Sequence, residues 1–308
     1  MRVLVLGGTG SIGTPVLRAL VMRGHEVIAL ARSNAASEKV TKLGAQPLSG
    51  DIERPHEWLG ALPPLGGVIH AASDFSDRVA AIDRALLEAL LPLLEKQSRK
   101  TRFIYTGGCW LFGETGNAVA TEATALKPLA ADAWWRGHLQ RILDASGIEP
   151  VVVHPAMVYE AAGGVFGGFA RDAIAGRPIR VVASEDVRWP LVHADDLATL
   201  YALALESGRP RESYIGSAID GLRVGRIAQA FAQRFAVVDR GIRIVTLDQI
   251  AAELGEWARG FGLDQQLSGA KARRSLGWAP QHRDAQGDIA AIVWGLLPCV
   301  PPLPCSRE

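Results

Sequence analysis

The segment Gly-Gly-Thr-Gly-Ser-Ile-Gly at positions 7–13 constrains the fold of this chain more than any other feature. It directly follows the apolar residues 3–6 and precedes residues 14–20, in which apolar side chains recur at helical spacing. A strand, a tight turn and a helix in this order present backbone N–H groups and the positive end of the helix dipole to an anion, which suits a pyrophosphate. We therefore predict that a dinucleotide is bound by Gly7, Thr9, Gly10, Ser11, Ile12 and Gly13.

The three glycines at this spacing have different predicted tasks. Gly7 allows the tight turn, Gly10 lets the backbone approach the phosphates, and Gly13 lets the helix pack closely on the strand. Such a triad is a weak signal by itself. Here it lies between a strand and a helix, which is the context that the motif requires.

The first half of the chain alternates between short apolar segments and segments of helical spacing. Strands are predicted at residues 2–6, 26–30, 45–48, 67–70, 102–106 and 150–154, and helices at 14–23 and 78–96. This alternation is typical of a parallel sheet with helices on both faces. The predicted fold class is therefore α/β, with a Rossmann-type doubly wound parallel sheet.

After residue 155 the alternation is less regular. Helices are predicted at 194–206, 224–235, 248–261 and 269–276, strands at 179–183, 213–215 and 242–246, and a flexible loop at 163–168 that is a candidate lid. We expect a dinucleotide-binding domain of residues 1–158, to which residues 190–218 return and belong. A smaller C-terminal α/β substrate-binding cap would comprise 159–189 and 219–308, because ligands of open α/β sheets bind at the carboxyl ends of the strands.

The composition excludes several kinds of partner. Of the 308 residues 48% are hydrophobic, enough for a large core, and the net charge of +1 includes no block of Lys and Arg. With no apolar run long enough to span a bilayer, we expect neither nucleic acid nor membrane as a partner. Cys109, Cys299 and Cys305 lack metal-ligand spacing, so we expect free thiols, no metal site and a cytoplasmic protein.

The residues after the second predicted strand indicate which dinucleotide binds. A cofactor without a 2′-phosphate is usually held there by an Asp or Glu, but this strand ends in Ala31, Arg32 and Ser33. Arg32 offers a planar, permanently charged fork to a 2′-phosphate, about 20 residues after the glycine turn. We therefore predict NADP(H), bound by Arg32 and Ser33. The alternative is an ordinary exposed arginine at the end of a strand.

Seven segments, in the expected order, resemble motifs of the extended short-chain dehydrogenase/reductase family, in its epimerase/dehydratase group. They are the glycine turn, Gly-Asp-Ile at 50–52, Val-Ile-His-Ala-Ala at 68–72, residues 103–113, His-Pro-Ala-Met-Val-Tyr at 154–159, Leu-Val-His-Ala-Asp-Asp-Leu-Ala at 191–198 and Leu-Gly-Trp-Ala-Pro at 276–280. The resemblance implies an oxidoreductase that forms a homodimer through the helices at 78–96 and 133–145. It also implies cofactor contacts at Asp51, Ile52, Ala71, Ala72, Ser73, Thr106, Arg136, Pro155 and Met157.

The catalytic signature of that family is missing. The family uses a Tyr as acid and base and a Lys four residues later, and no YxxxK occurs here. Alignment of the corresponding helix places Asp132 at the Tyr position, Arg136 at the Lys position and Gly108 at the usual Ser or Thr position, with Thr106 two residues earlier. Arg136 can hold the ribose but cannot release a proton. Asp132 can act as an acid only if burial raises its pKa. The alternative is an i,i+4 ion pair of small stabilising value.

Other side chains are candidates for proton transfer or substrate contact. Tyr159 is retained as a possible acid beside Asp132, Arg136 and Thr106. Tyr105 and His193 are interpreted as structural, and His138 as exposed or structural. Substrate contacts are predicted at Gly108, Cys109, Trp110, Trp135, Arg188 and Trp189, which together favour an apolar or aromatic molecule. The alternative for each Trp is a place in the core, and for Arg188 a place on the surface.

Three functions are compatible with these residues. The first, which we favour, is an NADP-dependent oxidoreductase with an altered proton relay, acting on a small molecule that needs no strong acid, such as an activated alkene or a quinone-like carbonyl. The second is a non-redox enzyme on the same scaffold, a cyclase, isomerase or dehydratase. The third is a protein that senses NADP(H) without turnover. The absence of YxxxK favours the second and third, and the intact cofactor motifs favour the first and second.

Overall fold

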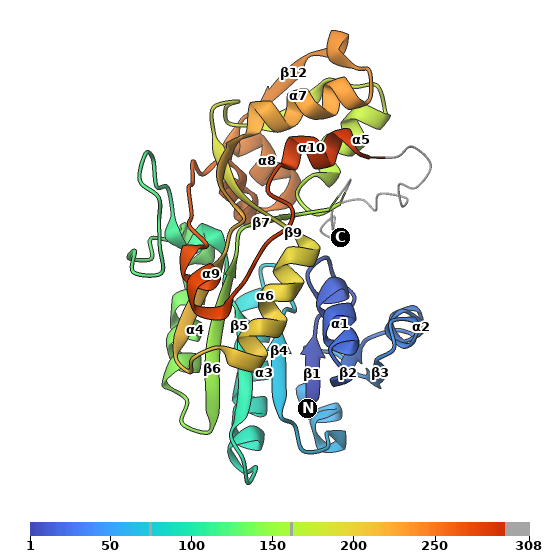
Figure 1. Ribbon diagram of the computed structural model, residues 1–308, viewed down its shortest axis with the longest axis vertical. Coiled ribbons are helices and arrows are strands. Elements are labelled where there is room, and N and C mark those ends of the chain that lie inside the picture. Colours follow the sequence, from blue (N-terminus) through green and yellow to red (C-terminus); the bar gives the residue numbers. More distant parts are fainter. Residues whose placement is uncertain (74–75, 161–162, 293–308) are drawn as a thin grey trace.

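A parallel sheet of seven strands forms the centre of the protein in this computed structural model, which describes residues 1–73, 76–160 and 163–292 (Figure 1). Its strand order is β10 (Glu212–Gly216), β6 (Ile148–Pro155), β5 (Thr101–Thr106), β4 (Gly67–His70), β1 (Arg2–Leu6), β2 (Glu26–Ala31) and β3 (Gln46–Ser49). All six pairings are parallel. The predicted doubly wound α/β fold is therefore confirmed.

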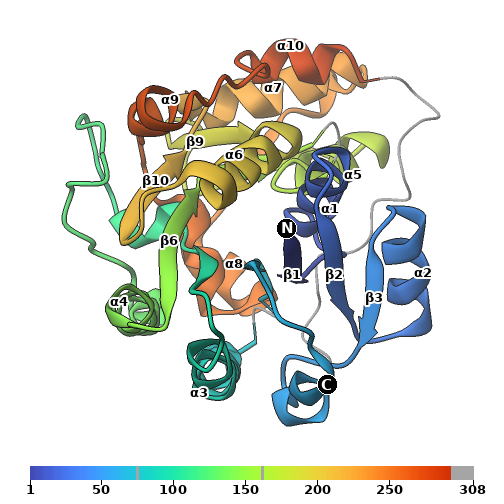
Figure 2. The same cartoon turned by 60° about the horizontal axis from the view of Figure 1, so that its bottom comes forward.

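Helices cover both faces of this sheet (Figure 2). On one face lie α1 (Gly13–Met22), α2 (Asn34–Lys42) and α6 (Ala194–Ser207), and on the other lie α3 (Val79–Glu95) and α4 (Trp134–Asp144). Side chains alternate between the two faces along each strand. On β5, Ile104 packs in the core beneath α1, α2 and α6, whereas Phe103 and Tyr105 pack in the core beneath α3 and α4. Buried on both faces, the strands are almost continuously apolar.

A smaller part lies at the carboxyl ends of the strands, in the upper half of Figure 1. It contains a three-stranded sheet of β11 (Ile219–Arg223), β9 (Arg188–His193) and β7 (Met157–Tyr159), and a two-stranded sheet of β12 (Ile242–Val245) and β8 (Ile179–Val182). Its helices are α5 (Gly167–Ile174), α7 (Val224–Arg234), α8 (Leu247–Leu254) and α10 (Ala285–Ala290), whereas α9 (Ala270–Leu276) packs on α6 and β10 of the large sheet. Its apolar side chains form a separate core.

The structure differs from the predicted elements at several places. Helices α2, α5 and α10 and strands β7, β9 and β11 were not predicted, and α5 begins inside the segment 163–168 that was expected to be a flexible loop. The helix expected at 248–261 is interrupted, because Gly255 has a φ of +104° and the chain continues as a 3₁₀ helix at Glu256–Gly262. Cys299 and Cys305 lie outside the described residues, and the division into two domains stays a prediction.

None of the helices within the described ranges is long and apolar enough to cross a membrane.

Candidate cofactor and active site

The glycine turn between β1 and α1 is built around two close backbone contacts. Gly7 has a φ of +84°, and a Cβ added there would lie 2.5 Å from the Ala71 carbonyl oxygen. A Cβ on Gly13 would lie 2.0 Å from the Gly7 oxygen. By contrast, the nearest atom to a Cβ on Gly10 would be 3.5 Å away. Gly7 and Gly13 are therefore required by the turn itself, whereas a Cβ on Gly10 would make only an ordinary van der Waals contact within the protein.

The N-terminus of α1 offers donors to an anion. The helix begins at Gly13 without a side-chain cap or an acidic residue in its first turn. Within the described residues, no hydrogen bond uses the amides of Ser11 and Ile12. Uncapped amides at a helix N-terminus together with the helix dipole suit a phosphate group. The Thr9 carbonyl, on the other side of the turn, accepts from the Lys39 ammonium at 2.9 Å.

The end of β2 carries positive charge next to this turn. Arg32 is exposed and forms no ion pair with any described residue, and the Ser33 hydroxyl caps α2 by accepting from the Ala36 amide at 3.2 Å. Lys39 brings a second cation from α2 to the same turn. The sequence analysis missed Lys39 because α2 was not predicted.

The ends of β3 and β4 continue the predicted cofactor path. Asp51 forms a local turn, in which its Oδ1 accepts from the Glu53 amide at 3.1 Å, and the Trp58 indole donates to its carbonyl at 2.8 Å. Ile52 is half-buried. After β4, Ala71 and Ala72 are half-buried and Ser73 is exposed, next to the undescribed residues 74 and 75. The predicted cofactor residues from Gly7 to Ser73 thus follow the carboxyl ends of β1 to β4.

The turn after β5 contains Gly107 and Gly108, and the rings of His154 and Trp135 pack against these two glycines. Gly108 stands where the family motif has a Ser or Thr. The Trp135 ring lies over Gly108, because a Cβ there would lie 3.3 Å from it. His154 on β6 packs behind Gly107, where a Cβ would lie 2.3 Å from its Nδ1. Burial lowers the pKa of His154 to about 4, so its imidazole is neutral at neutral pH. Pattern analysis assigned no role to His154, since nothing local shows that it packs against this turn.

Asp132 lies beside this turn with one oxygen unused. It ends a 3₁₀ helix at Ala130–Asp132, is 6% exposed, and its Oδ2 has no hydrogen-bond partner among the described residues. Burial raises the pKa of this carboxyl to about 6. The Asp132 charge also acts on the thiol of Cys109, whose own burial raises its pKa to about 12. Asp132 therefore meets the condition for an acid, and the Cys109 thiol stays protonated.

Arg136 is exposed on α4, one turn after Asp132. Of the ion pairs between described residues, none joins the two, so the alternative of an i,i+4 pair has no support. The guanidinium is free to contact a ligand. Because Arg136 does not pair with Asp132, burial alone raises the pKa of Asp132.

Two predicted catalytic side chains are bound elsewhere. The Thr106 hydroxyl is 2.6 Å from the hydroxyl of Tyr201 on α6, which places it on the sheet face opposite α4. The Tyr159 side chain is fully buried in the smaller part, where it donates to Asp288 at 2.7 Å and stacks on Phe166. Burial, followed by Asp288, raises the pKa of Tyr159 well above its usual range. The structure does not bring these two hydroxyls to Asp132.

The predicted substrate contacts separate into two groups. In the first group, Trp135 lies over Gly108, and the neighbouring Cys109 is close enough to Asp132 for its charge to act on the thiol. Arg188 instead forms a two-pronged ion pair with Asp264, at 2.8 and 2.6 Å, and also donates to the Gly116 carbonyl at 2.7 Å. Its charge is therefore neutralised within the protein.

The remaining predicted contacts join an aromatic cluster. Trp189 is 4% exposed and donates to the Phe261 carbonyl, and the half-buried Trp110 stacks on Trp257 at 6.1 Å. Pro155 and Met157, which connect β6 to β7, are buried. The cluster follows the turn that carries Gly108, so aromatic rings extend from that turn into the smaller part.

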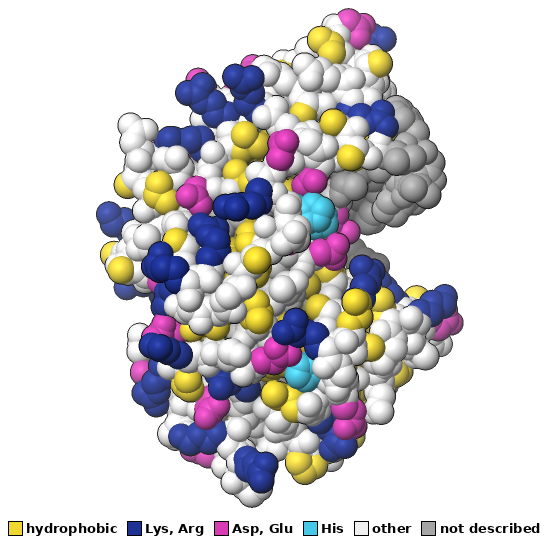
Figure 3. Space-filling view, in the orientation of Figure 1, with side chains coloured by type: hydrophobic (Ala, Val, Ile, Leu, Met, Phe, Trp, Pro, Cys, Tyr) yellow, Lys and Arg dark blue, Asp and Glu magenta, His cyan; other side chains and the backbone are white. Residues whose placement is uncertain are grey.

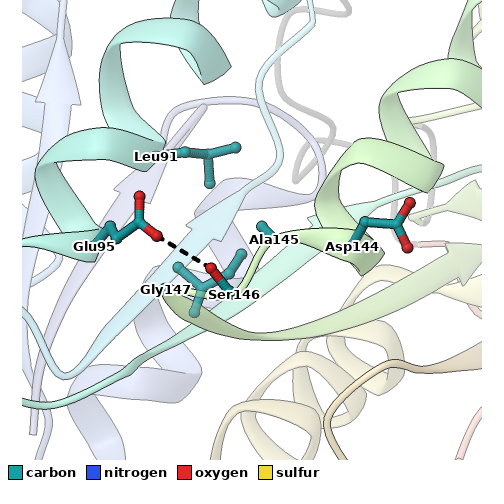
Figure 4. Close-up of a pocket in the computed structure, with 7 residues that line it drawn as sticks. Leu91, Glu95, Asp144, Ala145, Ser146 and Gly147 are labelled. Atoms are coloured by element: carbon teal, nitrogen blue, oxygen red, sulfur yellow. Dashed lines mark hydrogen bonds between the residues drawn. The ribbon is translucent and has the colours of Figure 1, made fainter.

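Two cavities lie away from these residues. One, of about 230 Å³, lies where α3 and α4 end and β6 begins, and the Ser146 hydroxyl donates to Glu95 there (Figure 4). It is at the amino ends of the strands, opposite the edge where α/β sheets bind ligands. The other, an open groove of about 470 Å³, includes Lys271 of α9, which pairs with Glu212 at 2.7 Å. Lys and Arg side chains gather on the edge of the molecule near α9 (left in Figure 3).

Comparison with known proteins agrees with this architecture. Residues 3–216 match the model of the NAD dependent epimerase/dehydratase family. An uncharacterised protein of Schizosaccharomyces pombe is 26% identical, over 94% of this chain and 99% of its own length. The 4-hydroxy-2-methyl-3-oxo-4-farnesyl-3,4-dihydroquinoline-1-oxide ketoreductase of Stigmatella aurantiaca is 26% identical, over 93% and 94%.

A solved structure shows the same fold. dTDP-glucose 4,6-dehydratase from Bacillus anthracis, crystallised in complex with NAD, superposes with a TM-score of 0.79 at 15% identity, and the match covers 94% of both chains. With more than half of its residues matched by the family model, the chain belongs to the NAD-dependent epimerase/dehydratase family.

Proposed function

We propose that this protein is an NADPH-dependent oxidoreductase that reduces a small conjugated carbonyl or alkene. One observation carries the proposal: a buried carboxyl with a pKa of about 6 and an unused oxygen stands beside the turn after β5. That is the position in the chain at which the family resemblance places the acid. The relative from Stigmatella aurantiaca, which matches nearly the whole chain, is named a ketoreductase.

The cofactor assignment is supported by the shape and charge of the glycine turn. The positive φ of Gly7 and the close contact at Gly13 shape a turn whose open side, at Gly10, admits a diphosphate. Arg32 and Lys39 supply two positive charges near the end of β2 and the glycine turn, where a 2′-phosphate would bind. These charges favour NADPH over NADH, although the related dehydratase was crystallised with NAD.

The chain's own groups divide the reaction between them. Bound NADPH would supply the hydride. The neutral Asp132 carboxyl donates a proton to the substrate oxygen that gains negative charge, and regains its proton from solvent. Arg136 holds the nicotinamide ribose through its guanidinium donors and releases no proton itself. The Trp135 ring over Gly108 gives the substrate a flat apolar surface, which favours a planar molecule.

The decisive experiment follows NADPH oxidation by absorbance against a panel of quinones, enones and aromatic ketones. Oxidation that is slowed by Arg136→Ala supports the proposed reductase. Product formation without net loss of NADPH supports a non-redox enzyme, which the missing Tyr and Lys favour. Tight NADPH binding without turnover of any panel member supports a sensor, and either outcome contradicts the proposal.

Arg32→Ala is expected to weaken NADPH binding about 10- to 100-fold, because it removes a charged hydrogen bond to the 2′-phosphate. NADH binding should change less than about threefold, since NADH has no group for Arg32 to contact. Fluorescence titration of both cofactors measures the difference, with Arg78→Ala, an exposed arginine paired with Glu53, as a control. Equal losses for NADPH and NADH would remove the NADP assignment.

The cytoplasmic location and the homodimer through α3 and α4 stay predictions. Sedimentation equilibrium of the purified protein measures the second.

A further inference from the structure

A buried carboxylate on α3 contacts side chains from three other elements, β4, β5 and α4, that carry parts of the proposed site. Asp83 is 7% exposed. Its Oδ1 lies 2.6 Å from His70 Nε2, and its Oδ2 lies 2.7 Å from the Tyr105 hydroxyl and 2.5 Å from His138 Nδ1. Tyr105 donates to the carboxylate through its hydroxyl. Three contacts of this length on one buried carboxylate form a connected polar network.

Asp83 is ionised in this network. Burial opposes the charge, but His70 and the hydrogen bonds from His138 and Tyr105 outweigh burial, so the pKa of Asp83 lies well below its usual range. The amide of Ala72 contacts the other ring nitrogen of His70 at 3.4 Å. The network therefore reaches the chain segment that follows β4.

Each of the three elements that α3 contacts through Asp83 carries a part of the proposed site. His70 ends β4 and precedes Ala71 and Ala72, and Tyr105 lies on β5 three residues before Gly108. His138 lies on α4, which follows Asp132 and also carries Trp135 and Arg136. No proposed step of the reaction uses Asp83, His70 or His138.

The same network touches the tryptophans of α4. The Trp134 ring meets His138 edge-on at 4.9 Å and stacks on Trp135 at 5.3 Å. Trp135 in turn lies over Gly108 and interacts with the Tyr105 hydroxyl. Two routes thus connect the carboxylate to the turn after β5, one through Tyr105 and one through His138 and the tryptophan pair.

We infer that Asp83 is a positioning residue for the proposed reduction: by binding His138 it fixes α4 against β4 and β5, and so sets Asp132 and Trp135 against the turn that carries Gly108. This inference rests on the proposed function. The surface contact between α3 and α4, an Arg141–Glu88 pair at 3.2 Å, is exposed to solvent and contributes little to that placement.

Asp83→Asn tests the inference with little change in shape. Asn keeps one acceptor oxygen but turns an NH₂ group toward donors, so the network loses contacts. We expect kcat to fall about 10- to 100-fold, while the Kd for NADPH changes less than about threefold, since the glycine turn and Arg32 are untouched. The pH at which turnover declines should also move, because a displaced α4 changes the burial of Asp132. A merely structural contact would lower the yield of folded protein without moving that pH.

His138 variants provide a second test that does not alter the carboxylate. His138→Leu removes the donor, whereas His138→Asn can place an amide N–H near the position of Nδ1. We expect His138→Asn to retain more turnover than His138→Leu. The effects of Asp83→Asn and His138→Leu should not add in the double variant, because both break one contact.

Matched controls and a readout independent of turnover separate the possible failures. Asp144→Asn makes the same chemical change at an exposed site on α4, and Glu88→Gln breaks the surface pair. Hydrogen exchange of the α4 amides should increase at least tenfold in Asp83→Asn and remain unchanged in both controls.

The results that overturn the inference are specific. If Asp83→Asn folds, binds NADPH and keeps wild-type kcat and pH profile, Asp83 does not position the site. Unchanged exchange in α4 has the same consequence, even if no substrate is found. If the wild type fails to bind NADPH while Asp83→Asn loosens α4, the proposed function fails and the role of the network in placing α4 stands.

Discussion

Asp132→Asn is expected to slow turnover about 100- to 10,000-fold and, at pH 8, to stabilise the protein. The rate falls because an amide cannot donate the proton that the substrate oxygen requires. The stability rises because the buried wild-type carboxylate finds no partner for Oδ2 in the part of the chain that the structure describes. With a folded pKa of about 6, the cost of ionising it is about 2–3 kcal/mol.

The pH dependence gives the sign of this effect. The folded pKa of Asp132 is raised above that of the unfolded chain, so its contribution to stability is fully present below the unfolded value, near 4, and is lost as the pH rises through about 6. The stabilisation by Asp132→Asn should therefore grow between pH 4 and 6 and level off above. Turnover of the wild type should decline above pH 6 as the acid form disappears.

Urea unfolding at several pH values measures the effect on stability, and initial rates measure the effect on turnover. Asp144→Asn, an exposed change on α4, should alter neither. A variant at position 132 that is less stable than the wild type at pH 8, or that keeps its turnover, would contradict the role given to this carboxyl.

Gly10→Ala should abolish measurable NADPH binding while leaving the protein as stable as the wild type. The added Cβ has its nearest neighbour at 3.5 Å in the absence of cofactor, so the turn accepts it, but the methyl group occupies the open side where the phosphates approach. We expect the Kd for NADPH to rise at least about 100-fold. Thermal unfolding should shift by less than about 2 °C.

Gly13→Ala is the matched comparison. There the Cβ would lie 2.0 Å from the Gly7 oxygen, so the turn must open, and both binding and stability should be lost. Thermal unfolding and fluorescence titration of the two variants distinguish an approach path from a structural contact. If Gly10→Ala binds NADPH normally, the cofactor does not lie on this turn.

Local patterns were sufficient to predict the central parallel sheet and the turn between its first strand and helix. The glycine turn, the strands of the parallel sheet and the end of β2 each depend on residues adjacent in sequence, and the structure shows the sheet as predicted. Lys39 is the exception, because its contact with Thr9 spans 30 residues and its helix has few apolar side chains to signal it. Helical periodicity alone cannot detect such a helix.

The active site was less predictable because it depends on long-range contacts. The burial that raises the pKa of Asp132 is not visible in its neighbours, and Asp83 meets His138 only through the packing of α3 on α4. Arg188 was expected to contact a substrate, but Asp264, 76 residues later, binds it. A motif indicates which residue occupies a position, and the fold decides which partners reach it.

A crystal structure of the NADPH complex tests the central claim most directly. The account predicts the diphosphate on the N-terminus of α1 and the Asp132 carboxyl within about 3–4 Å of the site where a substrate oxygen would lie beside the nicotinamide. A diphosphate bound elsewhere, or a nicotinamide ring closest to another titratable side chain with Asp132 facing away, would contradict it.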